Sequence, residues 1–181
     1  MPTTTSYLKL LPALVIGATV SFSAPAFSAG GGSSNTIKVP SCKKGSIWNK
    51  KKKKCVKIKK SSSLDDDNLF ESARDLAYHG RYDEAIDVLK LAKNQNAPRI
   101  LNYLGYSTRK LGDIEKGLTY YTAALKVDPN YTLVREYMGE AFLQLGQVDK
   151  AKEQLTEIEK RCGVGCREYS LLKAEIDKAV Q

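Results

Sequence analysis

The chain has 181 residues, enough for one ordinary domain with extensions, and it carries a formal net charge of +9. It has ten tyrosines but only one histidine and one tryptophan, which leaves few residues for a catalytic or metal centre. The charge is uneven, because residues 38–60 contain eleven lysines and no acid, whereas residues 61–181 contain all 20 acidic residues. This asymmetry is typical of a protein with a basic segment that meets a polyanion.

The first 29 residues have the pattern of a secretory signal peptide. Residues 8–22 are apolar except for Lys9 and a few small polar residues, and small residues follow in SAPAFSAGGG. We expect cleavage after residues 26–29 and a flexible linker over residues 30–41. The apolar run is shorter than the roughly 20 residues that span a bilayer, so no transmembrane segment is expected in the mature chain. The expected location is the periplasm of a Gram-negative bacterium or the extracellular space.

A lysine-rich segment bracketed by cysteines occupies residues 42–60. Apolar Ile47 and Trp48 are followed by a turn, and then by Val56 and Ile58 alternating with lysines, which predicts a β-hairpin. The predicted polyanion-binding residues are Trp48, Lys50, Lys51, Lys52, Lys53 and Lys54. Outside the cytoplasm their ligands would be anionic lipid, lipopolysaccharide or cell-wall glycan, and nucleic acid is a poor candidate. The alternative is a solubilising, partly disordered arm.

Four cysteines in an exported chain favour disulfides. Of the three possible connectivities, the local pairs Cys42–Cys55 and Cys162–Cys166 are preferred. The spacing of Cys42 and Cys55 also faintly resembles part of a peritrophin-type chitin-binding module, so carbohydrate stays an alternative ligand. For Cys162 and Cys166 the alternative is a metal-binding Cys-x-x-x-Cys site, but no histidine accompanies it.

After a linker at residues 61–66, the body of the chain repeats three times over residues 67–165. In each unit a small residue, a glycine and a second small residue recur at the same spacing: Ala73, Gly80 and Ala85, then Gly105, Gly112 and Gly117, then Gly139, Gly146 and Ala151. The central glycine ends one helix and the small residues let two helices approach closely. Such a hairpin cannot bury its apolar face alone, so the units must stack.

The middle unit, residues 98–131, shows the pattern best. Gly112 ends its first helix, Asp113 caps its second, and Pro129 breaks that helix before the next unit. The three acids at residues 65–67 are interpreted as the start of a helix rather than a cation site.

These features resemble the tetratricopeptide repeat family over residues 66–165. The middle unit has Leu101, Leu104, Gly105, Tyr121, Ala124 and Pro129 at the family's positions, and departs from it at Thr108 and Gly117. The resemblance implies an all-α fold, a right-handed α-α superhelix of three helical hairpins. A stripe of Tyr169, Leu172, Ile176 and Ala179 predicts a capping helix over residues 166–181.

The family binds extended peptides or helices in a concave groove lined by the first helix of each unit. The resemblance places Phe70, Arg74, Ala77, Asn102, Tyr106, Arg109, Glu136, Glu140 and Leu143 in this groove. A clamp for a terminal carboxylate is not expected, because Phe70 stands where the first clamp lysine would be and Glu136 and Glu140 have the wrong sign. The alternative is that these residues form solvated helix faces.

No set of residues has the pattern of a catalytic site. His79 precedes Gly80 in a predicted turn, where it has no evident partner, and no glycine-rich phosphate loop occurs. We therefore expect no catalytic activity, cofactor or metal. The predicted function is a non-enzymatic interaction module that binds an envelope protein in its groove, and the alternative is a polyanion- or carbohydrate-binding protein acting through residues 42–60.

Overall fold

The structure is a computed structural model that describes residues 42–60 and 64–181. The predicted signal peptide, the linker at residues 30–41 and residues 61–63 lie outside this part of the chain. A hairpin of β1 (Ser46–Asn49) and β2 (Lys54–Lys57) comes first, followed by the short 3-10 helix η1 (Ile58–Lys60). The α-helices that follow are α1 (Asp66–Tyr78), α2 (Tyr82–Leu89), α3 (Pro98–Lys110), α4 (Ile114–Val127), α5 (Thr132–Gln144), α6 (Val148–Cys162) and α7 (Arg167–Ala179).

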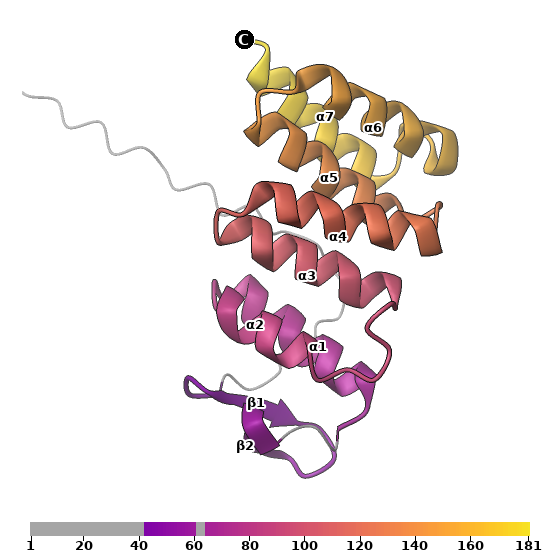
Figure 1. Cartoon of the computed structure of the whole chain (residues 1–181). Coiled ribbons are helices and arrows are strands. Elements are labelled where there is room, and N and C mark those ends of the chain that lie inside the picture. Colours follow the sequence, from indigo (N-terminus) through magenta and orange to yellow (C-terminus); the bar gives the residue numbers. More distant parts are fainter. Residues whose placement is uncertain (1–41, 61–63) are drawn as a thin grey trace, which may run out of the picture. The chain divides into compact units, whose positions relative to one another are not determined.

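The helices form three stacked pairs, as predicted (Figure 1). Within each pair α1 packs on α2, α3 on α4, and α5 on α6, and each second helix also contacts the first helix of the next pair. The first helices α1, α3 and α5 contact one another as a row. Helix α7 packs against both α5 and α6, which places it as the predicted cap at the end of the stack.

The turns within the pairs confirm the glycine prediction. Gly80, Gly112 and Gly146 follow α1, α3 and α5 with φ of 73°, 101° and 70°, a conformation that residues with a Cβ rarely adopt. The next helix then begins within two residues. For α4, the side chain of Asp113 accepts a hydrogen bond from the backbone N–H of Lys116 at 3.2 Å.

The acidic residues before α1 also behave as predicted. The side chain of Asp65 accepts a hydrogen bond from the backbone N–H of Asn68 at 2.8 Å and caps the helix. Asp66 and Asp67 lie in the first turn, where the helix dipole favours negative charge.

The apolar core runs through the stack as three neighbouring clusters. The first reaches the hairpin, because Ile47 of β1 is only 2% exposed and belongs to the cluster of α1, α2 and α3. The last reaches α7, where Leu172 and Ile176 are buried with Phe142, Ala151 and Ile158. The hairpin and α7 therefore both cover apolar surface of the helical pairs. The prediction that Ala179 belongs to the buried stripe is wrong, because this residue is exposed.

The hairpin is an ordered part of the structure. Its strands pair antiparallel, with Ile47 opposite Val56 and Trp48 opposite Cys55. The disulfide Cys42–Cys55 closes it. The alternative of a partly disordered arm is thus wrong for residues 42–60.

Candidate functional site

Aromatic side chains form a continuous row across α1, α3 and α5. We call the sides of these helices that carry the row the inner face. Ring centroids lie 5.4 Å apart for Phe70 and Tyr103, 5.9 Å for Tyr103 and Tyr106, and 5.0 Å for Tyr106 and Tyr137. Pairs at these distances attract one another and hold the rings in place.

Two further tyrosines extend this row. The hydroxyl groups of Tyr78 and Tyr103 are 2.8 Å apart, and the Tyr82 ring lies 6.1 Å from the Tyr106 ring. Tyr78 is 61% exposed, so an aromatic ring of the inner face is open to solvent. Tyr78, Tyr103 and Tyr137 are not among the groove residues predicted from the sequence, and Tyr103 and Tyr137 are buried. The high tyrosine count was the available signal, since Tyr103 and Tyr137 directly follow two predicted groove positions.

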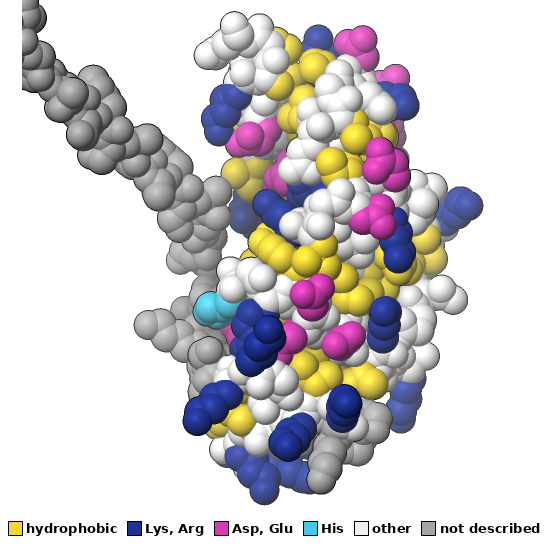
Figure 2. All heavy atoms as spheres, turned by 60° about the vertical axis from the view of Figure 1, so that its left-hand side comes forward, with side chains coloured by type: hydrophobic (Ala, Val, Ile, Leu, Met, Phe, Trp, Pro, Cys, Tyr) yellow, Lys and Arg dark blue, Asp and Glu magenta, His cyan; other side chains and the backbone are white. Residues whose placement is uncertain are grey.

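Basic side chains lie over the same rings. The guanidinium groups of Arg74 and Arg99 stand 5.7 Å and 5.0 Å from the Phe70 centroid. Lys110 stands 5.6 Å from the Tyr106 centroid. Cation–π contacts of this kind hold the charged groups beside the rings. In Figure 2, apolar side chains reach the surface over the central helices, with basic and acidic groups between them.

Arg109 is enclosed rather than open. It is 3% exposed, its Nη2 donates to Glu140 at 2.6 Å, and its Nε donates to the Tyr121 hydroxyl at 3.4 Å. These contacts join α3, α4 and α5. Arg109 therefore supports the inner face from beneath and is not a free ligand-binding group.

Two other predicted groove residues are buried as well. Asn102 is 0% exposed and Glu136 is 3% exposed. Burial raises the pKa of Glu136 to about 8, and the nearby negative charge of Glu140 adds to the shift while Arg167 opposes it.

The structure therefore divides the predicted groove residues into two groups. Ala77, Asn102, Arg109 and Glu136 are buried, so the alternative of solvated faces is wrong for them. Phe70, Arg74, Tyr106, Glu140 and Leu143 are half-buried. The second group remains accessible together with Tyr78, so it makes up the reachable part of the inner face.

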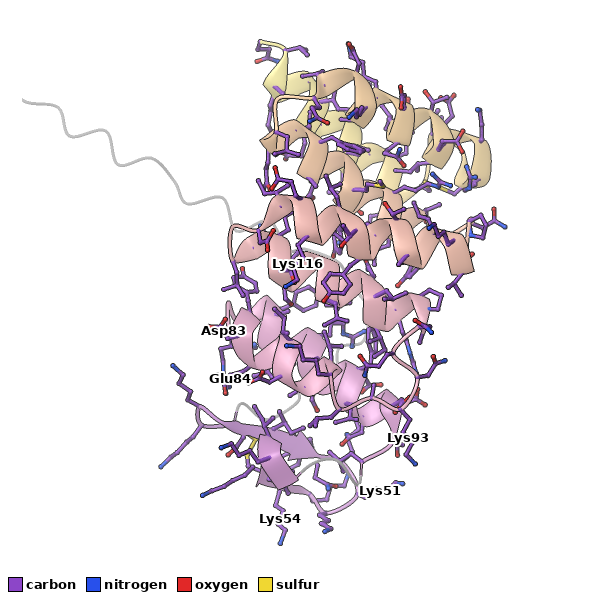
Figure 3. The ribbon with its side chains drawn as sticks, viewed as in Figure 1. Lys51, Lys54, Asp83, Glu84, Lys93 and Lys116 are labelled. Carbon is purple, nitrogen blue, oxygen red and sulfur yellow. A yellow bond between two sulfur atoms is a disulfide. The ribbon has the colours of Figure 1, made fainter. Side chains whose placement is uncertain are left out.

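Some lysines of the hairpin are paired with acidic residues, and others are not. Lys50 forms an ion pair with Glu71 of α1, and Lys51 lies 3.1 Å from the carboxylate of Asp65. Among the described residues no carboxylate is within ion-pair distance of Lys52, Lys53 or Lys54, and all three are exposed. Figure 3 shows Lys54 extending away from the helices. Lys43, Lys44, Lys57 and Lys59 are also exposed and form no ion pair among the described residues, so residues 52–54 are the consecutive run of a wider basic surface. Trp48, also predicted to bind polyanions, is only half-buried, and its carbonyl accepts a hydrogen bond from the Ser72 hydroxyl at 3.5 Å.

A second set of contacts fixes the hairpin to α2. The Arg81 guanidinium donates to the carbonyl of Cys42 at 2.8 Å and to the carboxylate of Glu84 at 2.8 Å. Glu84 in turn accepts a hydrogen bond from the backbone N–H of Gly45. The hydrogen bond from Arg81 lowers the pKa of Glu84. Figure 3 shows Glu84 at the start of α2, on the side of the hairpin.

The second disulfide joins Cys162 and Cys166 between α6 and α7, as predicted. A carboxylate oxygen of Glu168 and the two sulfur atoms all lie within 4.8 Å of one another. The sulfurs are bonded to each other, so the cysteine thiolates that a metal site would need are not available in this state. His79 is the C-cap residue of α1, in the predicted turn. The expectation that it has no partner is wrong, because its Nδ1 lies 2.8 Å from the carbonyl oxygen of Asp75.

Comparison with known families and structures agrees with this architecture. The tetratricopeptide repeat family matches residues 109–176. A search of curated protein sequences finds no match to the chain.

Solved structures with the same arrangement of helices are of tetratricopeptide-repeat domains and chaperones. The match to the first tetratricopeptide-repeat domain of human RPAP3 covers 62% of this chain and 89% of that domain, at 20% sequence identity and a TM-score of 0.54. The match to PcrH of Pseudomonas aeruginosa covers 64% of this chain and 92% of PcrH, at 18% sequence identity and a TM-score of 0.55. The match to SycD of Yersinia enterocolitica covers 63% of this chain and 88% of SycD, at 18% sequence identity and a TM-score of 0.53. That SycD structure is a complex with a peptide of the translocator YopD.

The stacked pairs, their glycine turns and these comparisons define a helical-repeat fold of three antiparallel helical pairs. The chain has the fold of tetratricopeptide-repeat domains, with a disulfide-closed basic hairpin before its first helical pair. Within residues 42–60 and 64–181, none of the helices has the length and apolar character needed to cross a bilayer.

Proposed function

We propose that this protein is a non-enzymatic interaction module that binds an extended segment or a helix of a protein partner on its inner face. The observation that carries the proposal is the reachable part of the inner face. Half-buried Phe70 and Tyr106 pack against the buried rings of Tyr103 and Tyr137 and have basic groups above them. Tyrosine supplies a large contact area with few rotatable bonds, and arginine adds hydrogen bonds, so both are frequent in binding hot spots.

Similar folds in other proteins support a peptide ligand. SycD holds a peptide of YopD, and an RPAP3 domain is bound to an HSP90 peptide. In this chain the chemistry of the inner face defines the class of partner. An apolar or aromatic stretch with acidic groups would fit the inner face, because the guanidinium group of Arg74 lies beside the Phe70 ring and forms no ion pair among the described residues, whereas Arg99 is ion-paired with Asp67.

The proposed location is the periplasm or the outside of the cell, following cleavage of residues 1–29. Two disulfides support an oxidising compartment, since such bonds rarely persist in a reducing cytosol. Measuring the intact mass of the protein recovered from the periplasmic fraction tests this. We expect the mass of a chain that begins at one of residues 27–30 and has no free thiol. Recovery of the full-length chain from the cytosol would contradict the proposed location.

The binding experiment uses a photo-crosslinking amino acid in living cells. Placed at Tyr78, an exposed residue of the inner face, it should capture discrete proteins, whereas the same group at exposed Lys126 on α4 should not. Arg74→Glu should then reduce capture at least tenfold, and Lys126→Glu, a matched charge reversal, should leave it unchanged. Equal capture from both positions would reject the inner face as the binding surface.

The hairpin supports a second candidate function, the binding of an anionic envelope surface. Lys52, Lys53 and Lys54 are exposed and without acidic neighbours among the described residues, and the disulfide and β-ladder hold them together. Crowded positive charge on a fixed loop repels itself, and an anionic surface relieves this repulsion. Attachment by the hairpin would localise the inner face without competing with it.

Sedimentation with phosphatidylglycerol vesicles tests this second function. Binding should fall steeply between about 50 mM and 300 mM salt, because charges on an exposed surface are screened. Replacing Lys52, Lys53 and Lys54 with serine should abolish it, whereas serine at Lys90, Lys93 and Lys126, three exposed lysines elsewhere, should have little effect. Equal losses in the two triple variants would mean that only net charge matters and that the hairpin is not a site.

A further inference from the structure

Neither interaction surface uses the disulfide in the turn between α6 and α7. Cys162 is the last residue of α6, and Cys166 is the N-cap residue of α7. The Cys162 side chain is exposed and that of Cys166 is half-buried. A dissolved thiol therefore reaches the sulfur of Cys162 more easily than that of Cys166.

The two sulfur atoms lie at helix ends of opposite polarity. Cys162 is at the carboxyl end of α6, where the unpaired carbonyl groups disfavour a negative charge. Cys166 is at the amino end of α7, where free N–H groups favour one, and thiols in such positions have a lowered pKa. When the bond breaks, a thiolate is thus better stabilised on Cys166 than on Cys162.

Charged neighbours act on the same bond in opposite directions. Arg167 follows Cys166 directly and favours a thiolate there. The Glu168 carboxylate lies within 4.8 Å of both sulfurs and opposes it. The charge of Glu168 is therefore expected to slow the breaking of this disulfide. Removing that charge by substitution tests this expectation.

We propose that Cys162–Cys166 is a thiol–disulfide exchange site, attacked at Cys162 and opened with Cys166 as the leaving group. An incoming thiolate forms a bond to the Cys162 sulfur, the Cys162–Cys166 bond breaks, and its electron pair stays on Cys166. A second thiolate attacks the small-thiol sulfur of the mixed disulfide, the bond from that sulfur to Cys162 breaks, and its electron pair stays on Cys162, which releases the disulfide of the small thiol. Each cysteine thiolate then takes a proton from water, so two thiols are oxidised and one protein disulfide is reduced.

Cys42–Cys55 provides an internal comparison. Attack on Cys55, the exposed member of that pair, would leave the thiolate on Cys42, which is 8% exposed. Burial disfavours the charged form. The pairing of Trp48 with Cys55 also keeps the hairpin closed after attack. This bond is therefore expected to be the more resistant of the two.

The experiment uses the oxidised full-length protein in buffers of graded reduced and oxidised glutathione, followed by acid quenching, alkylation and peptide mass spectrometry. The equilibrium constant for reduction by glutathione should be at least tenfold larger for Cys162–Cys166 than for Cys42–Cys55. This ratio corresponds to a difference of about 30 mV in reduction potential. Mixed disulfides with glutathione should be found on Cys162. Circular dichroism should show unchanged helix content while the bond opens. Opening of Cys42–Cys55 at the same ratio, glutathione on Cys166, or opening only with loss of helix would each overturn the proposal.

Variants separate this chemistry from a purely structural disulfide. Glu168→Gln should raise the rate of opening by glutathione several-fold, and Glu175→Gln, an exposed carboxylate further along α7, should leave it unchanged. In Cys162→Ser the remaining thiol of Cys166 should alkylate at lower pH than the remaining thiol of Cys162 in Cys166→Ser. Equal alkylation profiles in the two variants, or equal rates with and without Glu168, would contradict the assigned roles.

Discussion

At the scale of single residues, small side chains decide how closely the helices approach. A Cβ at Gly105 would lie 2.5 Å from Cε1 of Tyr121 and 3.1 Å from the carbonyl oxygen of Gly117. The ring and the backbone cannot both move away without disturbing the contact of α3 with α4. Gly105 is thus required by packing, whereas Gly112 is required by its positive φ.

Gly105→Ala should lower the free energy of unfolding by about 1–3 kcal/mol, as expected for overpacking a filled core. Urea denaturation followed by circular dichroism measures this. Gly165→Ala is the matched control, because a Cβ there meets no atom within 4 Å and no positive φ is involved. A loss of similar size in both variants would mean that helix propensity or turn flexibility, not the approach to Tyr121, explains the effect.

Buried Glu136 should make stability depend on pH. Its pKa is about 8 in the folded protein, against 4.5 for an ordinary glutamate, mainly because of burial. Between these values the folded state keeps a proton that the unfolded state has released, so the free energy of unfolding falls as pH rises and levels off above pH 8. Glu136→Gln, which stays neutral, should remove this fall, with a change of up to about 1.4 kcal/mol per pH unit.

Thermal or urea unfolding of wild type and variant at several pH values between 5 and 9 checks this expectation. Glu153→Gln, an exposed carboxylate on α6, serves as the control. If the difference between Glu136→Gln and wild type does not grow over this range, Glu136 is charged in the folded protein.

Among the elements, the contact between the hairpin and α2 is centred on Arg81. Arg81 donates hydrogen bonds to the carbonyl groups of Cys42 and Lys43 and to the carboxylate of Glu84. The first two bonds join positions separated by 39 and 38 residues in the sequence. Ile47 adds apolar contact from the hairpin to the helices. A basic segment this polar could not bury enough surface to fold alone.

Arg81→Ala should release the hairpin from α2. Hydrogen bonds to a charged group contribute about 1.5–3 kcal/mol, so amide exchange in β1 and β2 should become at least tenfold faster while exchange in α3 to α7 stays the same. Hydrogen–deuterium exchange with mass spectrometry gives this readout. Arg161→Ala, which removes a comparable contact to the carbonyl of Pro129, should leave the hairpin unchanged.

At the scale of the whole molecule, each pair of helices is stabilised by its neighbours, and both ends of the stack need covering. The hairpin covers apolar surface of the first pair, and α7 covers the last through Leu172 and Ile176. A Cβ at Gly139 would lie 2.5 Å from Leu172, so α7 packs directly against the backbone of α5.

Ile176→Ala should therefore lower the free energy of unfolding by about 2–5 kcal/mol, as for other fully buried side chains. Calorimetry should show one transition at a lower temperature. Val180→Ala, at a 58% exposed position beyond α7, should have almost no effect. An unchanged melting temperature for Ile176→Ala would show that α7 does not stabilise the stack.

Local sequence patterns were enough to predict the period of the repeats, the turns and the helix caps. These are local: glycine adopts positive φ, Asp65 and Asp113 cap helices, and a stripe of Leu172 and Ile176 marks a buried face. It also indicated both cysteine pairs, since they are close in sequence.

Which side chains a partner can reach depends on how the helices and the hairpin pack against one another. Tyr103 and Tyr137 meet Tyr106 across neighbouring helices, Arg109 is enclosed by Glu140 and Tyr121, and Glu71 neutralises Lys50 of the hairpin. Each of these contacts joins residues of different elements. Helical spacing predicts which face of a helix is buried, but burial and pairing of polar groups depend on what the next element places opposite them.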